Sequence, residues 1–128
     1  MDEDRLAALV TFLQDRVGRN LRSVLWYDSD SGDYEVVYGR EDVMAQYDEA
    51  TIERIVTTYE IESMGKVLQE ARYEHGELAC VVRCFEDGIE INMLDDGEGV
   101  VIGLEAETFL AHNTFVGRCM EVAGLDEE

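Results

Sequence analysis

The chain contains no proline and none of the Ser/Gly-rich stretches that connect separate domains. It also contains no internal repeat and no low-complexity tract. At 128 residues it is long enough to bury roughly two thirds of the surface that its unfolded form exposes, so it needs neither a disulfide nor a metal to hold a core. We therefore expect a single domain over residues 1–128.

Positive charge is scarce. Lys66 is the only lysine, and 10 basic residues stand against 30 acidic ones, for a net charge of -20. Duplex nucleic acid and anionic membranes are bound mainly through Lys and Arg, so we expect neither as a partner. An acidic surface that prefers Arg to Lys resembles proteins of halophilic archaea, whose cytoplasm is concentrated brine. At molar salt the Debye length falls to about 3 Å, which screens the repulsion among the acids.

Long apolar segments are absent as well. The N-terminal stretch MDEDRLAALVTFLQ begins with acids and lacks the uninterrupted apolar run of a signal peptide or a membrane span. The three cysteines form no C-x-x-C pair, which fits a reducing compartment. These features predict a cytoplasmic protein.

The sequence has no motif of an enzyme or a metal site. Neither His75 nor His112 belongs to an H-E-x-x-H or H-x-H pattern, and no glycine-rich phosphate loop is present. The acidic loop 28–33 is similar to the start of a calcium loop, but position 39, where the closing glutamate would fall, is glycine. We therefore predict no catalytic residue, no cofactor and no metal ligand.

The cysteines are predicted to be core residues. Cys80 and Cys84 lie on one strand about 13 Å apart, too far for a disulfide or a shared metal, and their neighbours are apolar. Cys119 lies on the apolar side of the last predicted helix and behaves by default as a small buried hydrophobe. None of the three has the histidine and positive charge nearby that a catalytic cysteine needs.

Apolar spacing and turn residues divide the chain into eight main elements and one short helical turn. Asp48 is a predicted N-cap, and the helix that it starts either ends near residues 64–65 or continues through residue 68. The predicted elements are a helix over 4–17, strands over 21–27 and 34–38, a helical turn within 39–47, a helix from 49, strands over 77–85, 90–94 and 100–104, and a helix over 106–122.

The stretch 77–104 supplies three of the five strands. A two-residue turn at Asp87 and Gly88 places Glu86 opposite Ile89, because these residue types tolerate the positive φ that such a turn needs. One face of this hairpin is predicted core and carries Cys80, Val82, Cys84, Ile89, Ile91 and Met93. The other is either partly solvated or covered by an amphipathic helix, and carries Val81, Arg83, Phe85, Glu90, Asn92 and Leu94.

Two further elements carry more apolar residues than one core face requires. In the first hairpin, alternation places Trp26 with Val24 on one face and Tyr27 with Leu25 on the other. The last helix is apolar on more than one side, which predicts packing against the sheet and against either the first helix or another chain. Its apolar residues include Phe109, Phe115, Val116, Cys119 and Met120.

The order of helix, two strands, helix, three strands and helix predicts an α+β fold, with helices packed on one five-stranded antiparallel sheet. This order is similar to that of profilin-like folds, in particular the roadblock/LC7 family. That resemblance implies dimerisation, by sheet extension or helix packing, and a role as an adaptor or partner of small GTPases. The segments GELACVVRCFEDGIEI and LRSVLWYDSDSGDYEVVYGREDV resemble an uncharacterised family of small acidic haloarchaeal proteins. That resemblance implies a compact, brine-adapted domain.

The first functional hypothesis is a non-enzymatic protein-binding or regulatory domain, acting as a homodimer through a sheet edge or an outer helix surface. The second is small-molecule sensing, since profilin-like and PAS-like sheets hold ligands between sheet and helix. The third is an enzyme that uses one of the two histidines with an acid. A secretion-chaperone-like dimer also fits the size and acidity, although its usual order places three strands before two. A partner or ligand surface is expected to include Tyr38, Tyr59, His75, Arg83, Phe85 and Phe115.

Overall fold

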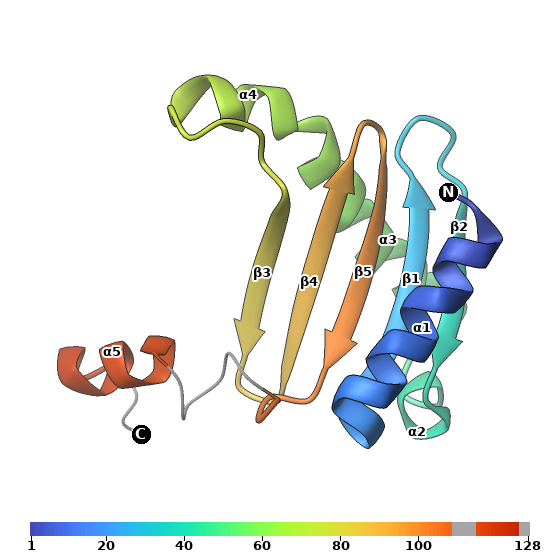
Figure 1. Cartoon of the computed structure of the whole chain (residues 1–128), viewed down its shortest axis with the longest axis horizontal. Coiled ribbons are helices and arrows are strands. Elements are labelled where there is room, and N and C mark those ends of the chain that lie inside the picture. The colour runs from blue at the N-terminus through green and yellow to red at the C-terminus, as the bar shows by residue number, and fades with distance from the viewer. Residues whose placement is uncertain (109–114, 126–128) are drawn as a thin grey trace.

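The computed structural model of the chain describes residues 1–108 and 115–125. Its centre is one five-stranded antiparallel sheet with the strand order β2-β1-β5-β4-β3 (Figure 1). This confirms the predicted α+β fold and its five-stranded sheet. The strands are β1 (Leu21–Asp28), β2 (Tyr34–Gly39), β3 (Cys80–Phe85), β4 (Gly88–Asp95) and β5 (Glu98–Leu104).

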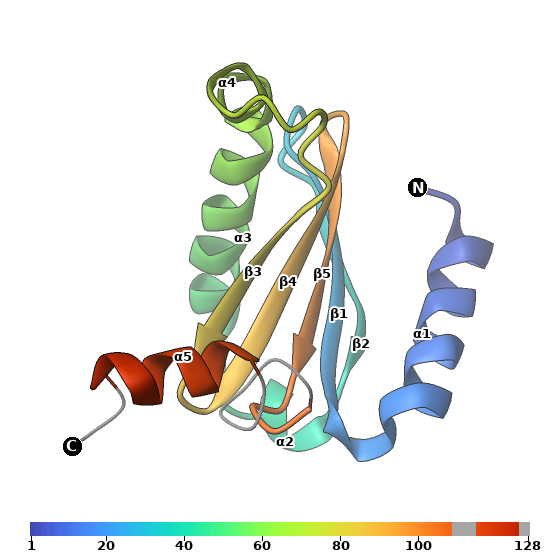
Figure 2. The same ribbon diagram turned by 60° about the vertical axis from the view of Figure 1, so that its left-hand side comes forward.

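The sheet is the middle layer, with helices on both faces. Helix α1 (Glu3–Val17) lies over β1 and β2 on one face, and α3 (Glu49–Met64) lies on the opposite face against β1, β4 and β5 (Figure 2). The other helical segments are shorter or lie at the ends of the sheet: η1 (Gly18–Asn20), α2 (Glu41–Met44), α4 (Lys66–Arg72) and α5 (Phe115–Ala123).

Alternation along the strands produces two separate cores. On the α1 face, Val24 packs with Leu6 and Leu13 of the helix and with Ile89, Val100, Ile102 and Leu104 of the sheet. On the α3 face, the cluster comprises Leu25, Tyr27, Val56, Tyr59 and Val101. The predicted division of the first hairpin is therefore confirmed, since Val24 and Trp26 belong to the α1 face and Leu25 and Tyr27 to the α3 face.

The second long helix begins and ends where its sequence provides a cap and a break. The Asp48 side chain accepts a hydrogen bond from the backbone N of Thr51 at 2.8 Å, which confirms the predicted N-cap. The helix ends at Met64, and after Gly65 a separate short helix begins at Lys66. The two alternatives for its end are thus both partly correct: α3 stops at the glycine, and α4 carries the helical spacing further.

The β3–β4 hairpin has the predicted faces but not the predicted register. Its turn consists of Glu86 and Asp87, so Cys84 lies opposite Ile89. A turn at Asp87 and Gly88 needs positive φ at both positions, which a residue with a Cβ resists. Among the described residues no non-glycine has positive φ, and Gly88 is not among the glycines that do. Because the pairing shifts by an even number of residues, every side chain keeps its predicted face.

The prediction that the two strand cysteines are core residues is wrong. Cys80 and Cys84 are both exposed, and Val82 between them is 40% exposed. Their face of the hairpin does point toward the α1 core, because Ile89 on the neighbouring strand is fully buried there. However, α1 lies over β1 and β2, and β3 is at the opposite edge of the sheet. Alternation therefore predicted the correct face for these residues, whereas the prediction that this face is core as far as β3 was wrong.

The last helix also differs from its prediction over 106–122. Residues 106–108 form a turn, in which the backbone N of Thr108 donates to the carbonyl oxygen of Glu105, and α5 starts at Phe115. Phe109 and His112 lie outside the described residues. Cys119 is exposed, contrary to prediction. Instead of lying on the sheet, the described part of α5 projects away from it beyond the β3 edge (Figures 1 and 2).

A buried polar pair joins the strands beneath α3. The Tyr27 hydroxyl donates to Oδ1 of Asn92 at 2.8 Å, and both residues have 0% exposure. The Asn92 amide nitrogen donates in turn to Oε1 of Glu62 on α3 at 2.7 Å. The ring of Tyr27 lies directly over Gly99, where a methyl group would overlap it. This chain of hydrogen bonds therefore links β1, β4 and α3.

Replacing Tyr27 by Phe removes the donor but keeps the ring. We expect the Y27F variant to lose about 1–3 kcal/mol of unfolding free energy, because the buried Asn92 oxygen loses its partner. Urea unfolding followed by circular dichroism measures this loss. The matched control is Tyr73→Phe, at a residue that is 59% exposed, and it is expected to leave stability unchanged. Equal effects of the two changes would show that the buried hydrogen bond contributes nothing.

Candidate functional site

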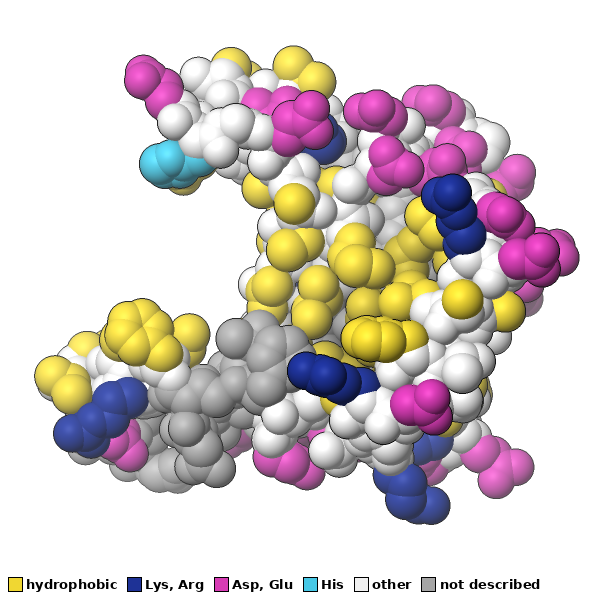
Figure 3. Space-filling model, viewed as in Figure 1, with side chains coloured by type: hydrophobic (Ala, Val, Ile, Leu, Met, Phe, Trp, Pro, Cys, Tyr) yellow, Lys and Arg dark blue, Asp and Glu magenta, His cyan; other side chains and the backbone are white. Residues whose placement is uncertain are grey.

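On the α1 face, an apolar strip of the sheet is not covered by any helix that the structure describes. We call it the open face; it consists of Cys80, Val82 and Cys84 of β3, with the half-buried Ile91 and Met93 of β4 beside them. Figure 3 shows apolar side chains gathered in this recess, with the acidic side chains of the view mainly on the rim around it. Strand β3 forms one edge of the sheet.

A second exposed apolar surface lies on α5. Phe115 is 81% exposed, Val116 41% and Val122 76%, and Leu125 just beyond the helix is 72% exposed. Phe115 and Val122 are seven positions apart and lie on one side of the helix, and Val116 lies on the adjoining side, so α5 carries exposed apolar side chains. The charged pair on this helix, Arg118 with Glu121, is mostly solvent-exposed.

A cavity of about 540 Å³ lies on the other side of the sheet, between the strands, α2 and the first half of α3. Its volume is within the range of about 300–1,000 Å³ that is typical of small-molecule sites. Most of the wall is apolar, formed by Leu25, Val36, Val43, Ile52, Ile55 and Val101. The polar side chains that reach it include Arg22, Ser23, Tyr59 and Glu90.

Glu90 is a partly buried acid in this wall. Its Oε1 accepts a hydrogen bond of 3.4 Å from the hydroxyl of Tyr59. Burial raises the pKa of Glu90 to about 7, although Arg22, the Tyr59 hydroxyl and Arg83 each favour the charged form. Burial, followed by the charge of Glu90, raises the pKa of Tyr59 well above its ordinary value. The cavity therefore contains a carboxyl group that changes charge near neutral pH.

Arg83 lies over the face of the Tyr59 ring. Its guanidinium pairs with Glu62 of α3, and its carbon Cζ lies 5.4 Å from the centre of the Tyr59 ring. The hydrogen bond to Glu62 is the main cause that raises the pKa of Arg83. Since Glu62 also accepts from Asn92, one carboxylate holds β3 and β4 against α3.

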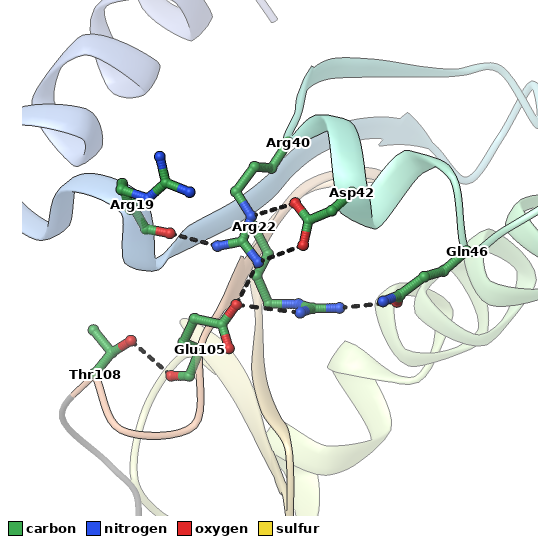
Figure 4. Close-up of polar contacts among 7 residues, drawn as sticks. All are labelled: Arg19, Arg22, Arg40, Asp42, Gln46, Glu105 and Thr108. Carbon is green, nitrogen blue, oxygen red and sulfur yellow. Dashed lines mark hydrogen bonds and ion pairs between the residues drawn. The ribbon is translucent and has the colours of Figure 1, made fainter.

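A network of arginines closes the end of the sheet next to the cavity (Figure 4). Glu105, directly after β5, accepts from Arg40 at 2.5 Å and from Arg22 at 3.4 Å. Arg40 also donates to Asp42 at 2.7 Å and lowers the pKa of that carboxyl. Arg22 reaches Gln46 with its other nitrogen at 3.5 Å. The charge of Arg22 at the cavity is therefore already compensated by a carboxylate.

Comparison with protein families identifies the chain. Its residues 7–124 match the family described as domain of unknown function (DUF7522). The chain belongs to the DUF7522 family. No curated protein matches the sequence.

The DUF7522 fold is similar to a solved structure, the roadblock/LC7 domain from Streptomyces avermitilis. The two share 15% sequence identity with a TM-score of 0.53, over 73% of this chain and 75% of that one. At this identity the likeness shows the fold alone. It agrees with the roadblock-like element order that the sequence predicted.

The structure brings three of the six predicted surface residues of the DUF7522 domain together. Tyr59 and Phe85 both line the cavity, and Arg83 lies over the Tyr59 ring. Tyr59 is only 5% exposed, so its hydroxyl contacts the cavity while its ring belongs to the core. Phe85 is 57% exposed and forms part of the cavity rim.

The other three predicted residues lie in different places. Tyr38 packs on the α1 face, so it does not share a site with Tyr59 across the sheet. His75 is exposed in the loop after α4 and stacks on Tyr73 with 6.2 Å between ring centres. Phe115 is on the exposed side of α5. Within the described residues no cluster of His, Cys, Asp and Glu is arranged to hold a metal ion, and no helix is long and apolar enough to cross a bilayer.

Sequence reasoning missed Glu90 and Arg22 as parts of a cavity. The only signal for Glu90 was its place on the mixed face of the hairpin, opposite Arg83, which indicated a helix above it. Helix α3 lies against β4 on that face, whereas Phe85 of β3 is 57% exposed. The sequence did not distinguish this acid from the other 29.

The raised pKa of Glu90 predicts a pH-dependent stability. An unfolded glutamate titrates near 4.5, so ionisation of Glu90 opposes folding increasingly between about pH 4.5 and 7. We expect the E90Q variant of the DUF7522 domain to be more stable than wild type above about pH 7, by up to about 3 kcal/mol, with no difference below about pH 4.5. Denaturant unfolding over this pH range measures it. A difference independent of pH would show that Glu90 is not the titrating group.

Proposed function

We propose that the DUF7522 domain is a non-enzymatic protein-binding or regulatory domain that acts as a homodimer. In this dimer, α5 of one copy covers the open face of the other. The observation that carries the proposal is that one chain exposes two apolar surfaces of matching kind, the open face and α5. The roadblock-like fold supports it, because that resemblance implies dimerisation.

Charge favours these two surfaces over others for contact between copies. With a net charge of -20, two copies repel each other over most of their surfaces. The open face contains no acid, and its five side chains are cysteine, valine, isoleucine and methionine. Covering them contributes about 25 cal/mol for each Å² of apolar surface removed from water.

A second copy of the chain can cover the open face, because it brings its own exposed α5 with it. Since α5 projects from its own sheet, each of two chains offers both a helix and an open face (Figure 2). A reciprocal exchange uses both surfaces twice and closes the assembly at two chains. The proposal therefore accounts for both exposed surfaces with one contact.

Replacing Val82 by Lys places a charge in the centre of the open face. We expect the wild-type chain to sediment as a dimer in molar KCl and the V82K variant to sediment as a monomer, because a lysine cannot be buried against α5 without losing its hydration. The Phe115→Lys variant changes the opposite side of the same contact and is expected to give the same result.

The matched control for these variants is Val67→Lys. Val67 is 75% exposed on α4 and does not belong to the open face. It receives the same new charge but is expected to remain dimeric. A monomeric wild type overturns the proposal, and a dimer that V67K breaks while V82K does not shows that the dimer uses another surface.

We further propose that the domain works in the cytoplasm of a halophilic archaeon. The net charge and the single lysine support this, since repulsion among so many acids is relieved only when salt screens it. The same charge supports a protein, rather than a nucleic acid or a membrane, as the partner.

Salt is therefore expected to stabilise the fold. The midpoint of thermal unfolding should rise steadily as KCl is raised from millimolar to molar concentration, because screening weakens the repulsion more in the compact state than in the unfolded chain. Circular dichroism measures the midpoint. Sucrose at equal osmolality is the control for solvent exclusion, and a midpoint that KCl does not raise beyond the sucrose value contradicts the halophilic proposal.

The second candidate function is small-molecule sensing. The cavity favours it, because its volume suits a small ligand and its apolar wall carries a few polar groups. The cavity and the open face lie on opposite sides of the sheet, so the two functions are compatible in one domain.

A further inference from the structure

We propose that the cavity beneath α3 binds a small organic cation, an amine with an apolar body, whose ammonium group pairs with the carboxylate of Glu90. The inference rests on the second candidate function, ligand sensing, and specifies the class of ligand. It is independent of the proposed dimer, which uses the other face of the sheet.

The shape of the cavity fits such a ligand. Its wall combines six aliphatic side chains with a small polar region around Glu90, Tyr59 and Ser23. An alkyl or aromatic body fills the apolar part, and burying each CH₂ group there contributes about 0.8 kcal/mol. One end of the ligand then lies next to the polar region, where Glu90 determines what kind of group is accepted.

The carboxylate of Glu90 has unused capacity for hydrogen bonds. The bond that the structure describes at this group is the 3.4 Å contact from the Tyr59 hydroxyl, which is long for an O–H donor. An ionised carboxylate offers about four acceptor positions, so further donors fit. An ammonium group supplies both N–H donors and the opposite charge, and such charge-assisted bonds are about twice as strong as neutral ones.

The charges around Glu90 favour a cation over an anion. The arginine in the wall, Arg22, is paired with Glu105, and the arginine behind Tyr59, Arg83, is paired with Glu62. Both guanidinium charges are therefore already compensated by carboxylates. Asp87 adds a further negative charge to the lining, and the net charge of -20 attracts cations to the whole surface.

A series of three probes with one apolar chain and different head groups tests the inference: hexylamine, hexanol and hexanoate. Isothermal titration calorimetry in molar KCl measures each dissociation constant for the full chain. We expect hexylamine to bind most tightly, hexanol more weakly and hexanoate least. The hexylamine affinity should also rise as pH is raised through about 7, because Glu90 then becomes charged while the amine stays protonated.

The Glu90→Gln variant removes the charge with little change of shape, and we expect it to weaken hexylamine binding at least about tenfold at high pH while leaving hexanol unchanged. The matched control is Glu86→Gln in the exposed hairpin turn, outside the cavity lining, which makes the same change to the net charge. E86Q is expected to bind hexylamine like wild type.

The possible outcomes distinguish a wrong ligand class from a wrong function. If hexanol or hexanoate binds and hexylamine does not bind more tightly, the amine assignment is wrong and ligand sensing stands. If E90Q and E86Q weaken hexylamine equally, the effect is that of net charge and Glu90 is not the partner. If none of the three probes binds, both the amine assignment and the sensing function are overturned.

Discussion

A single helix is too narrow to cover a five-stranded sheet, and the rest of this structure depends on that constraint. A helix with its side chains is about 10–12 Å wide, whereas neighbouring strands are about 4.8 Å apart. One helix therefore covers two or three strands. On the α1 face the covered strands are those around β1 and β2, and β3 remains exposed at the other edge. The exposure of the open face is a consequence of this geometry.

The same constraint separates what the sequence predicted from what it did not. The face of each residue in the β3–β4 hairpin follows from local alternation, and those assignments were correct even though the turn begins one residue earlier than predicted. Whether a face is buried depends on which helix lies over which strand, and that is not a local property. Cys80, Val82 and Cys84 have core-like sequence neighbours but lie at an uncovered edge, so composition alone indicated burial that tertiary structure does not supply.

The cavity shows a second limit of prediction. Its polar group, Glu90, comes from a chain with 30 acids, and no spacing or motif distinguishes it from the others. What distinguishes it is the α3 side chain placed over it, since Tyr59 and the pair of Arg83 with Glu62 remove the carboxyl from water. The sequence predicted that this mixed face is either partly solvated or covered by an amphipathic helix, and each alternative holds for part of it, since α3 lies against β4 and Phe85 of β3 is exposed. The raised pKa of Glu90 can be recognised only once the position of α3 over it is known.

The two sides of the sheet carry different kinds of recognition, and alternation keeps them independent. Val82 faces the open side, while its neighbour Arg83 faces α3, so a substitution at one is separated from the other by the thickness of the sheet. The open face is apolar and lies at an edge of the sheet, which suits another folded chain. The cavity combines an apolar wall with a partly buried acid, which suits a small cation. Loss of the dimer in V82K with hexylamine binding intact would thus be the behaviour of two sites on one scaffold, whereas joint loss would mean that the cavity requires the paired state.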